Sequence, residues 1–357
     1  MLKIKGLSIS ALLIATGAAA EAAPTVTQTS DFATGAALGA TGPDSVTLGG
    51  GSVWIEYSNG ADSTGAGGSS TIVQYGLNGA VENQYSILGS VDGLKVNPTN
   101  GMVWALQNQD GNSTLSIINP TTHAVSGPQS YGPPYSYGPM GGNGRGYDDV
   151  AFLNGSVYLS YTNPVNAADP VLQILINGNN PSGTLTTTNI LTSAQEGNAT
   201  DTDSLKTTPS GQLVLTSGAD GTFTLITNPG TVNQTETTTQ VNSGGANVSS
   251  IDDVLFPNAT SGTLYVSNTG SNDVLKLHLT GLNLNTPIVS IGSLNELAFV
   301  DPTTGVATPL LTGLTAPHGL AFAAPEPSTW AMLLLGFAGL GFAGYRASVK
   351  GQASLQS

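Results

Sequence analysis

The chain of 357 residues contains no cysteine, which excludes disulfide bonds, thiolate zinc sites and cysteine nucleophiles together. It is also poor in charge, with 22 acidic and 8 basic residues, and four of the basic ones (Lys3, Lys5, Arg346 and Lys350) lie near the two ends. Residues 23–324 therefore carry only four basic residues against 20 acidic ones. Such an anionic surface repels phosphate groups, which excludes nucleic-acid binding and polybasic docking to a membrane.

A helical architecture is excluded by composition. The chain has 47 Gly and 20 Pro, and Asn, Thr and Ser are abundant where a coiled coil or helical bundle needs Ala, Glu, Lys and Leu. The length fits about two domains or one large all-β unit.

The N-terminus has the three parts of a secretory signal peptide, in order, over residues 1–22. Lys3 and Lys5 form the positive region, residues 7–20 are apolar, and Ala20-Glu21-Ala22 offers a small-residue cleavage site before Ala23. The alternative is a first strand or helix of the core.

The C-terminal residues 330–345 (WAMLLLGFAGLGFAGY) contain no charge, and Arg346 and Lys350 follow them. As a helix this segment would be about 24 Å long, somewhat shorter than the ~30 Å hydrocarbon core of a bilayer, and snorkelling by Arg346 can make up the difference. We therefore predict a transmembrane helix with the body on the outer side. The alternative is a buried terminal helix of the globular body.

Directly before this segment lies the triplet Pro325-Glu326-Pro327. Triplet, apolar segment and basic residues, in this order, resemble the PEP-CTERM sorting tail, which is also labelled the ice-binding protein C-terminal domain. The resemblance covers residues 324–357 and implies an exosortase as partner: a membrane protease that cuts near the triplet and passes the protein to the cell surface or extracellular matrix of bacteria that make exopolysaccharide. The dense arginine run usual in such tails is missing here. Ice binding itself is not expected, because the threonine runs at 186–188 and 237–239 are too short for a flat array.

A repeat fills the region between the two ends. Each copy begins with Asp, a small or acidic residue and an aliphatic residue, and a β-rich strand follows after a turn. The copies begin at Asp44, Asp92, Asp148, Asp203 and Asp252, with a sixth start at His318. Their β-rich strands contain residues 53–55, 103–105, 157–159, 213–215 and 264–266. Units of ~40–50 residues with about four short strands are typical of a β-propeller, because a single blade cannot cover both of its own faces.

The predicted fold is therefore an all-β propeller over residues 23–323, with about six blades of which five are well formed. Residues 294–323, with 25–32 from the N-terminus, are expected to complete the sixth blade and close the ring. At the level of the repeat, the body resembles NHL and SMP-30/gluconolactonase propellers. A pair of β-sandwiches is the alternative fold.

The repeat places candidate ligands for a metal ion around one mouth of the central channel. If the first strand of each blade lines the channel, the side chains of Asp44, Asp92, Asp148, Asp203 and Asp252 converge, and a ring of carboxylates suits Ca²⁺. The alternative is that each aspartate hydrogen-bonds backbone N–H groups and locks neighbouring blades together. Asp149 and Asp253 add a second carboxylate to their copies and favour the ion.

Other motifs give weaker indications of a site. His123, His278 and His318 have no zinc-binding spacing, and no G-x-S-x-G elbow supports a serine hydrolase. The segment SYGPPYSYGPMGGNGRGY is rich in Pro, Gly and Tyr, and tyrosine rings can stack on sugars. The residues expected to do so are Tyr131, Tyr135, Tyr137 and Tyr147. The alternative is an insertion between blades without a ligand.

The sequence thus predicts an exported propeller that an exosortase processes and that acts as a binding or structural module, with neutral exopolysaccharide as the expected ligand. The alternative function is a calcium-dependent, lactonase-like hydrolase at the channel mouth. The expected location is the membrane, through the C-terminal helix, before processing, and the cell surface or extracellular space afterwards.

Overall fold

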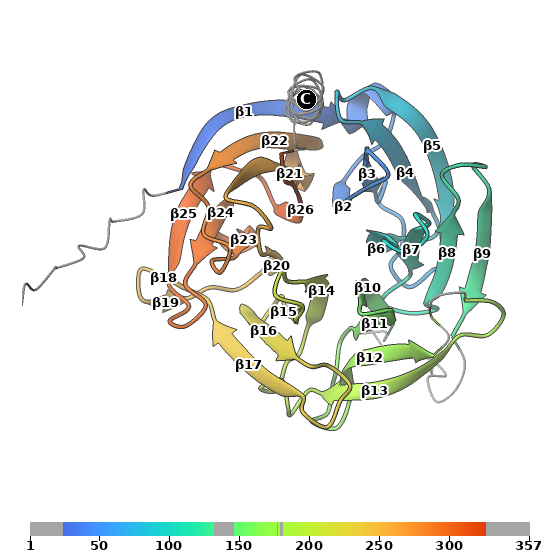
Figure 1. Cartoon of the computed structure of the whole chain (residues 1–357). Helices are drawn as coiled ribbons and strands as arrows, with labels where there is room; N and C mark the ends of the chain where they lie inside the picture. Colours follow the sequence, from blue (N-terminus) through green and yellow to red (C-terminus); the bar gives the residue numbers. More distant parts are fainter. Residues whose placement is uncertain (1–23, 132–145, 177, 179–180, 326–357) are drawn as a thin grey trace, which may run out of the picture.

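Six four-stranded antiparallel sheets surround a central axis in the computed structural model (Figure 1). It describes residues 24–131, 146–176, 178 and 181–325. The sheets are the blades of a β-propeller, so the predicted all-β class and the number of about six blades are confirmed. The pair of β-sandwiches is ruled out.

Blades 1 to 4 each use one continuous segment of chain, with the first strand innermost and the last outermost. Blade 1 contains β2 (Pro43–Gly49), β3 (Ser52–Tyr57), β4 (Ser69–Gly76) and β5 (Val81–Leu88). Blade 2 contains β6 (Val91–Val96), β7 (Val103–Gln107), β8 (Thr114–Ile118) and β9 (Val125–Ser130). Blade 3 contains β10 (Tyr147–Leu153), β11 (Ser156–Tyr161), β12 (Pro170–Ile176) and β13 (Thr186–Thr192). Blade 4 contains β14 (Thr202–Thr207), β15 (Leu213–Ser217), β16 (Thr222–Thr227) and β17 (Thr235–Gln240).

Blades 5 and 6 exchange strands with each other. Blade 5 contains β20 (Ile251–Leu255), β23 (Ile288–Ile291), β24 (Glu296–Val300) and β25 (Ala307–Thr312). Blade 6 contains β26 (Pro317–Ala323), β21 (Ser261–Asn268), β22 (Asp273–Thr280) and β1 (Thr25–Thr34), from the inside outwards. After β20 the chain crosses to blade 6 for one hairpin, returns to blade 5 for three strands, and crosses again for β26.

This exchange corrects part of the repeat assignment. The strand containing residues 264–266 does not follow β20 within one blade, because it pairs with β26 in blade 6. Of residues 294–323, β24 and β25 belong to blade 5 and only β26 belongs to blade 6. The hairpin β21–β22 has the same alternation of apolar residues as the others, so the pattern does not show which neighbouring blade it joins.

The ring closes through the N-terminal strand, as predicted. β1 is the outermost strand of blade 6 and pairs with β22 from Thr25↔Thr280 to Thr34↔Asp273. In Figure 1 the blue strand β1 lies against the brown strands of the C-terminal region. The first and last strands of the body, β1 and β26, therefore belong to the same sheet, and this shared sheet closes the ring.

Apolar residues from facing sheets form the core between the blades. Trp54 and Trp104, both only 1 % exposed, lie between blades 1 and 2 and between blades 2 and 3 respectively. Phe223 occupies the corresponding layer between blades 4 and 5. Aromatic and branched side chains on the central strands therefore pack blade against blade, as expected from the Val-Trp and Leu-Tyr patterns.

The short remaining elements lie in connections. A two-stranded hairpin, β18 (Asn242–Ser243) and β19 (Ala246–Asn247), follows blade 4. Three 3₁₀ helices are η1 (Gly35–Leu38), η2 (Thr269–Ser271) and η3 (Gly292–Leu294). No helix among the described residues is long and apolar enough to cross a membrane. The predicted signal peptide and the segment 330–345 lie outside the described residues.

Candidate metal centre

Every innermost strand begins with a β-bulge at the first two residues of the repeat. In blade 1, Pro43 pairs with Tyr57 and Val46 with Ile55, so β2 has one more residue than β3 over this stretch. The other five blades have the same extra residue at the same place. A bulge re-aims the side chains that it contains. The recurring pair of Asp and a small or acidic residue is therefore the bulge, and it explains why the repeat has this form.

The six first-position side chains meet at one end of the channel, which we call the ring end. Ligand atoms of Asp92, Asp148 and Asp203 all lie within 4.8 Å of one another, and so do those of Asp44, Asp252 and His318. The sequence-predicted aspartates are thus brought together, with His318 completing the circle. A cavity of about 30 Å³ lies among the five aspartates. That volume accommodates a single water molecule or ion.

Asp92, Asp148 and Asp203 form a group of carboxylates, and within the described part of the chain none of the three has an ion-pair partner, because Lys95 and Lys206 pair with Asp149 and Asp253. Burial raises the pKa of all three well above the ordinary range, and neighbouring carboxylates raise it further. Among the described residues, no N–H group donates to the side chains of these three aspartates. Oxygen ligands this close and this poorly compensated suit a hard divalent cation such as Ca²⁺.

His318 compensates the other half of the ring. Its Nδ1 lies 2.9 Å from Oδ1 of both Asp44 and Asp252. The charges of Asp252 and Asp44 raise the pKa of His318 far above its usual value, against the opposing effect of burial. Burial raises the pKa of Asp44, but His318 outweighs it and lowers the pKa below the ordinary value. The Nδ1 atom of His318 is therefore engaged by two carboxylates, and the raised pKa favours the protonated imidazole that compensates their charge.

Asp149 and Asp253, the second bulge residues of blades 3 and 5, lock neighbouring blades together. Asp149 accepts a hydrogen bond from Leu205 N (3.0 Å) and forms an ion pair with Lys95 at 2.8 Å. Each of these bonds reaches a different neighbouring blade. The locking role that the sequence left open for the first aspartate is thus filled by the second aspartate.

Asp253 repeats this arrangement two blades further on. It accepts hydrogen bonds from Ser204 Oγ (2.7 Å) and Leu320 N (2.6 Å) and pairs with the ammonium group of Lys206. Its backbone N–H donates to Ser290 Oγ at 2.8 Å, as that of Asp149 does to Ser160 Oγ. Sequence analysis did not identify these lysine partners. The available signal was a lysine three residues after the first aspartate in two alternate blades.

Glu56 is a further acidic residue beside the ring that sequence analysis missed. On β3, Glu56 lies between Ile55 and Tyr57, the two residues whose partners on β2 flank the bulge of blade 1. Ser160 and Ser290 have the same position opposite the bulges of blades 3 and 5. Its side chain is completely buried, and neither carboxylate oxygen makes a hydrogen bond of ordinary geometry. Burial and the charges of Asp44 and Asp92 raise its pKa well above the usual range, although Ser70 lowers it. A positive charge in the cavity would compensate this buried acid.

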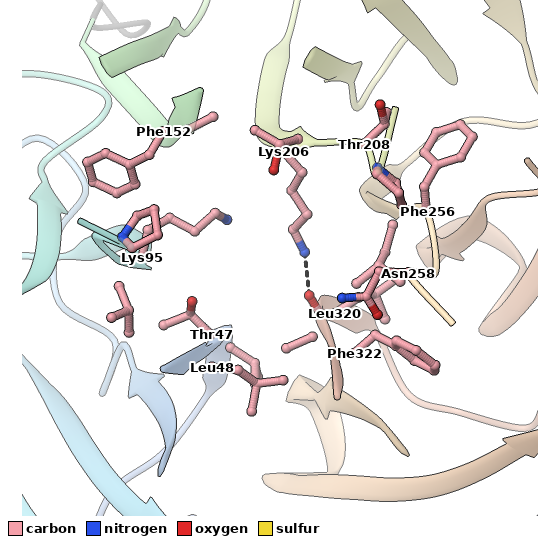
Figure 2. Close-up of a pocket in the computed structure, with 18 of the residues that line it drawn as sticks. Thr47, Leu48, Lys95, Phe152, Lys206, Thr208, Phe256, Asn258, Leu320 and Phe322 are labelled. Carbon is pink, nitrogen blue, oxygen red and sulfur yellow. Dashed lines mark hydrogen bonds between the residues drawn. The ribbon is translucent and has the colours of Figure 1, made fainter. Parts of the chain in front are cut away.

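A larger pocket of about 490 Å³ lies where the innermost strands end, and we call this the pocket end of the channel. Phe152, Phe256 and Phe322 contribute to its wall (Figure 2). The ammonium groups of Lys95 and Lys206 reach into its middle, and Lys206 donates to the backbone oxygen of Leu320. Because both lysines also border the small acidic cavity, they separate the two ends of the channel.

The tyrosines proposed for sugar stacking divide into two pairs. Tyr147 is fully buried and its hydroxyl bonds Gln173 and, at 2.9 Å, Thr187. Tyr131 is 7 % exposed and its ring centroid lies 4.3 Å from that of Tyr147. Protein therefore covers both rings, which are not presented to a ligand. Tyr135 and Tyr137 lie outside the described residues.

Comparison with known proteins identifies the tail and the general fold. Residues 323–347 match the PEP-CTERM protein-sorting motif, so the predicted resemblance of the tail is confirmed. The search of curated proteins finds no match.

Among solved structures, the fold is similar to several propellers of low sequence identity. The periplasmic gluconolactonase of Pseudomonas aeruginosa is 10 % identical with a TM-score of 0.49, covering 80 % of this chain and 89 % of that one. A putative gluconolactonase is 12 % identical with a TM-score of 0.48, covering 82 % and 83 %. The virginiamycin B lyase of Staphylococcus aureus is 12 % identical with a TM-score of 0.45, covering 82 % and 91 %. At these identities the likeness concerns the fold alone.

Proposed function

We propose that this chain is an exported binding module, processed by an exosortase, whose six-bladed propeller holds a divalent cation at the ring end of its channel. The sorting motif at 323–347 supports export and processing. The observation that carries the metal centre is the convergence of Asp92, Asp148 and Asp203 around a small cavity without a compensating N–H donor.

The donor set favours Ca²⁺ over transition metals. The ligands of this group are carboxylate oxygens, and Nδ1 of His318, on the other side of the ring, is already paired with Asp44 and Asp252. Asp92, Asp148 and Asp203 would hold the ion, with Glu56 compensating its charge from behind β2. Asp44 and Asp252 stay paired with His318 and close the other half of the ring.

Calorimetric titration of the exported chain with Ca²⁺ tests this proposal. The Asp148→Asn/Asp203→Asn variant should bind at least about tenfold more weakly, a loss of ~1.4 kcal/mol or more. Asp62→Asn, which changes an exposed acid away from the ring, is the matched control. Unchanged affinity in the double variant would contradict the metal centre.

Stability without Ca²⁺ separates this role from the locking alternative. If the aspartates are ion ligands, replacing them by asparagine relieves repulsion between buried carboxylates, so the ion-free variant should be at least as stable as the wild type. If they lock blades, the same change should destabilise the fold. Urea unfolding in the presence of a chelator measures the difference.

The predicted polysaccharide ligand depends on exposed rings, and two of the four tyrosines are covered. The binding role therefore rests on the cation and on polar loops rich in Asn, Gly and Ser, which suit a neutral polyhydroxyl ligand held by Ca²⁺. Retention of the exported chain on neutral exopolysaccharide beads with Ca²⁺, and its release by a chelator, is the expected result. Equal retention with and without Ca²⁺ would contradict this mode.

A hydrolase is the second candidate, and one observation favours it. A pocket of about 360 Å³ opens beside the ring and is lined by Asp203, Asp252 and His318 together with Asp201 and Ser250. A small substrate there would lie next to a bound cation that could polarise its carbonyl group. Ca²⁺-dependent hydrolysis of an aldonolactone, lost in Asp148→Asn/Asp203→Asn, would establish the enzyme. Binding of Ca²⁺ without hydrolysis would leave the binding module.

A further inference from the structure

The sorting tail leaves the propeller at the pocket end, from a groove between blades 6 and 1. β26 is the innermost strand of blade 6 and runs from Pro317 at the ring end to Ala323 at the pocket end. Ala323, Ala324 and Pro325 then line a groove of about 660 Å³, together with Leu48 and Phe322. The end of the propeller from which the tail departs is therefore fixed by the direction of β26.

Very little chain separates this point from the apolar segment. Only residues 326–329 lie between Pro325 and Trp330. The five Cα–Cα steps between them span at most about 17 Å when fully extended. A bilayer that holds residues 330–345 must consequently lie within about 17 Å of the pocket end.

The two ends of the propeller differ strongly in charge. Most acidic residues of the described body lie at the ring end, either in loops or at the ends of strands. The exceptions are Asp31, within β1, and Glu82, Glu236 and Asp301, which lie nearer the pocket end. The turns that follow the innermost strands at the pocket end carry no charged residue. They are residues 50–51, 97–102, 154–155, 208–212 and 256–260. The charged side chains in the pocket itself are Lys95 and Lys206.

We infer that, before exosortase cuts the tail, the chain stands with its pocket end against the surface of the bilayer and its acidic ring end facing away from it. The short connection brings the pocket end to the membrane, and repulsion by anionic headgroups keeps the acidic end from turning towards it. The proposed cation centre is then open to solvent while the lysine pocket faces lipid. This inference rests on export and sorting and is independent of the metal centre.

Single cysteines can test this orientation because the chain has none of its own. Thr99→Cys and Ser210→Cys place an exposed thiol in pocket-end turns, and Ala66→Cys and Val165→Cys place one in ring-end loops. The exported chain, with its tail attached, is reconstituted in vesicles of phosphatidylethanolamine and phosphatidylglycerol. Each thiol carries an environment-sensitive fluorophore, and lipids spin-labelled at the headgroup serve as quenchers.

The two ends are about 20 Å apart, since β26 has seven residues at ~3.3 Å each. Labels at 99 and 210 should therefore be quenched at least about twofold more than labels at 66 and 165, because quenching requires near contact with the headgroups. Equal quenching at the two ends, or stronger quenching at 66 and 165, would overturn the orientation. Failure of the chain to float with the vesicles would refute anchoring and the inference with it. Neither result would alter the Ca²⁺ titration.

Discussion

Replacing Asp253 by alanine should remove the interaction that joins blades 4, 5 and 6. Asp253 is only 3 % exposed and receives hydrogen bonds from Ser204, Lys206 and Leu320. The side chain of Lys206 is 12 % exposed and would lose its ion-pair partner. The change therefore leaves the buried N–H of Leu320 without its acceptor and leaves the nearly buried ammonium group of Lys206 with only the backbone oxygen of Leu320.

The expected loss follows from these two groups. An unsatisfied buried N–H costs about 1–3 kcal/mol, and removing one partner of a buried ion pair typically costs about 3–5 kcal/mol in all. We expect a decrease near the lower value, about 3 kcal/mol, because water still reaches Lys206 from the pocket. Such a decrease is a large part of the ~5–15 kcal/mol that stabilises a typical domain.

Urea unfolding, followed by the fluorescence of the buried Trp54 and Trp104, measures this loss. Lys206→Met and the double variant Asp253→Ala/Lys206→Met complete a double-mutant cycle, and the double variant should be less destabilised than the sum of the two. Asp301→Ala is the matched control, since Asp301 is an exposed aspartate that accepts hydrogen bonds from Thr303 and Thr304 of its own turn. If Asp253→Ala costs no more than Asp301→Ala, the locking role is refuted.

Three further predictions concern pH, ion binding and processing. Burial raises the pKa of Glu196 from an ordinary 4.5 to about 7, so the folded state holds this proton more tightly than the unfolded state, and about 3 kcal/mol of stability present below pH 4.5 is lost as pH rises through 7. Glu196→Gln should therefore be as stable as the wild type at pH 4 and more stable at pH 8. Curves of unfolding free energy against pH that run parallel for the two proteins would contradict this. Ca²⁺ should bind more tightly at pH 8 than at pH 5 and release protons, because Asp92, Asp148 and Asp203 have raised pKa values and must ionise to bind the ion. A binding enthalpy that does not change with the ionisation enthalpy of the buffer would show that no proton is released, and would contradict this. Intact-mass spectrometry of exported protein should show a chain ending near Pro327 in an exosortase-bearing host and an uncut chain when the protease is deleted. Exported protein that keeps residues 330–345 in the exosortase-bearing host would count against processing.

The sequence anticipated the site better than it anticipated the topology. A repeat that begins with Asp and an aliphatic residue two positions on was sufficient to predict the converging ring, because identical local patterns adopt identical places in radially arranged sheets. The same pattern could not assign the hairpin β21–β22 to its blade. Alternation of apolar residues identifies a strand, but it does not specify which of two neighbouring sheets the strand joins.

Within the site, the sequence could not separate the two roles of the aspartates. Whether Asp148 or Asp149 bonds the neighbouring blade depends on the bulge, which turns one side chain to the channel and the other to Lys95 and Leu205. Glu56 gave no signal, because a single glutamate in a strand looks like a surface residue until the neighbouring blade covers it.

The sequence by itself determined that the chain carries a PEP-CTERM sorting motif and that its body is a ring of similar modules, because sorting motifs and repeats are local and linear. Only the tertiary structure decided which carboxylates share a cavity, which are paired with Lys95, Lys206 and His318, and from which end the tail departs. Those features depend on distances between residues far apart in the chain, and such distances are set by how the blades pack.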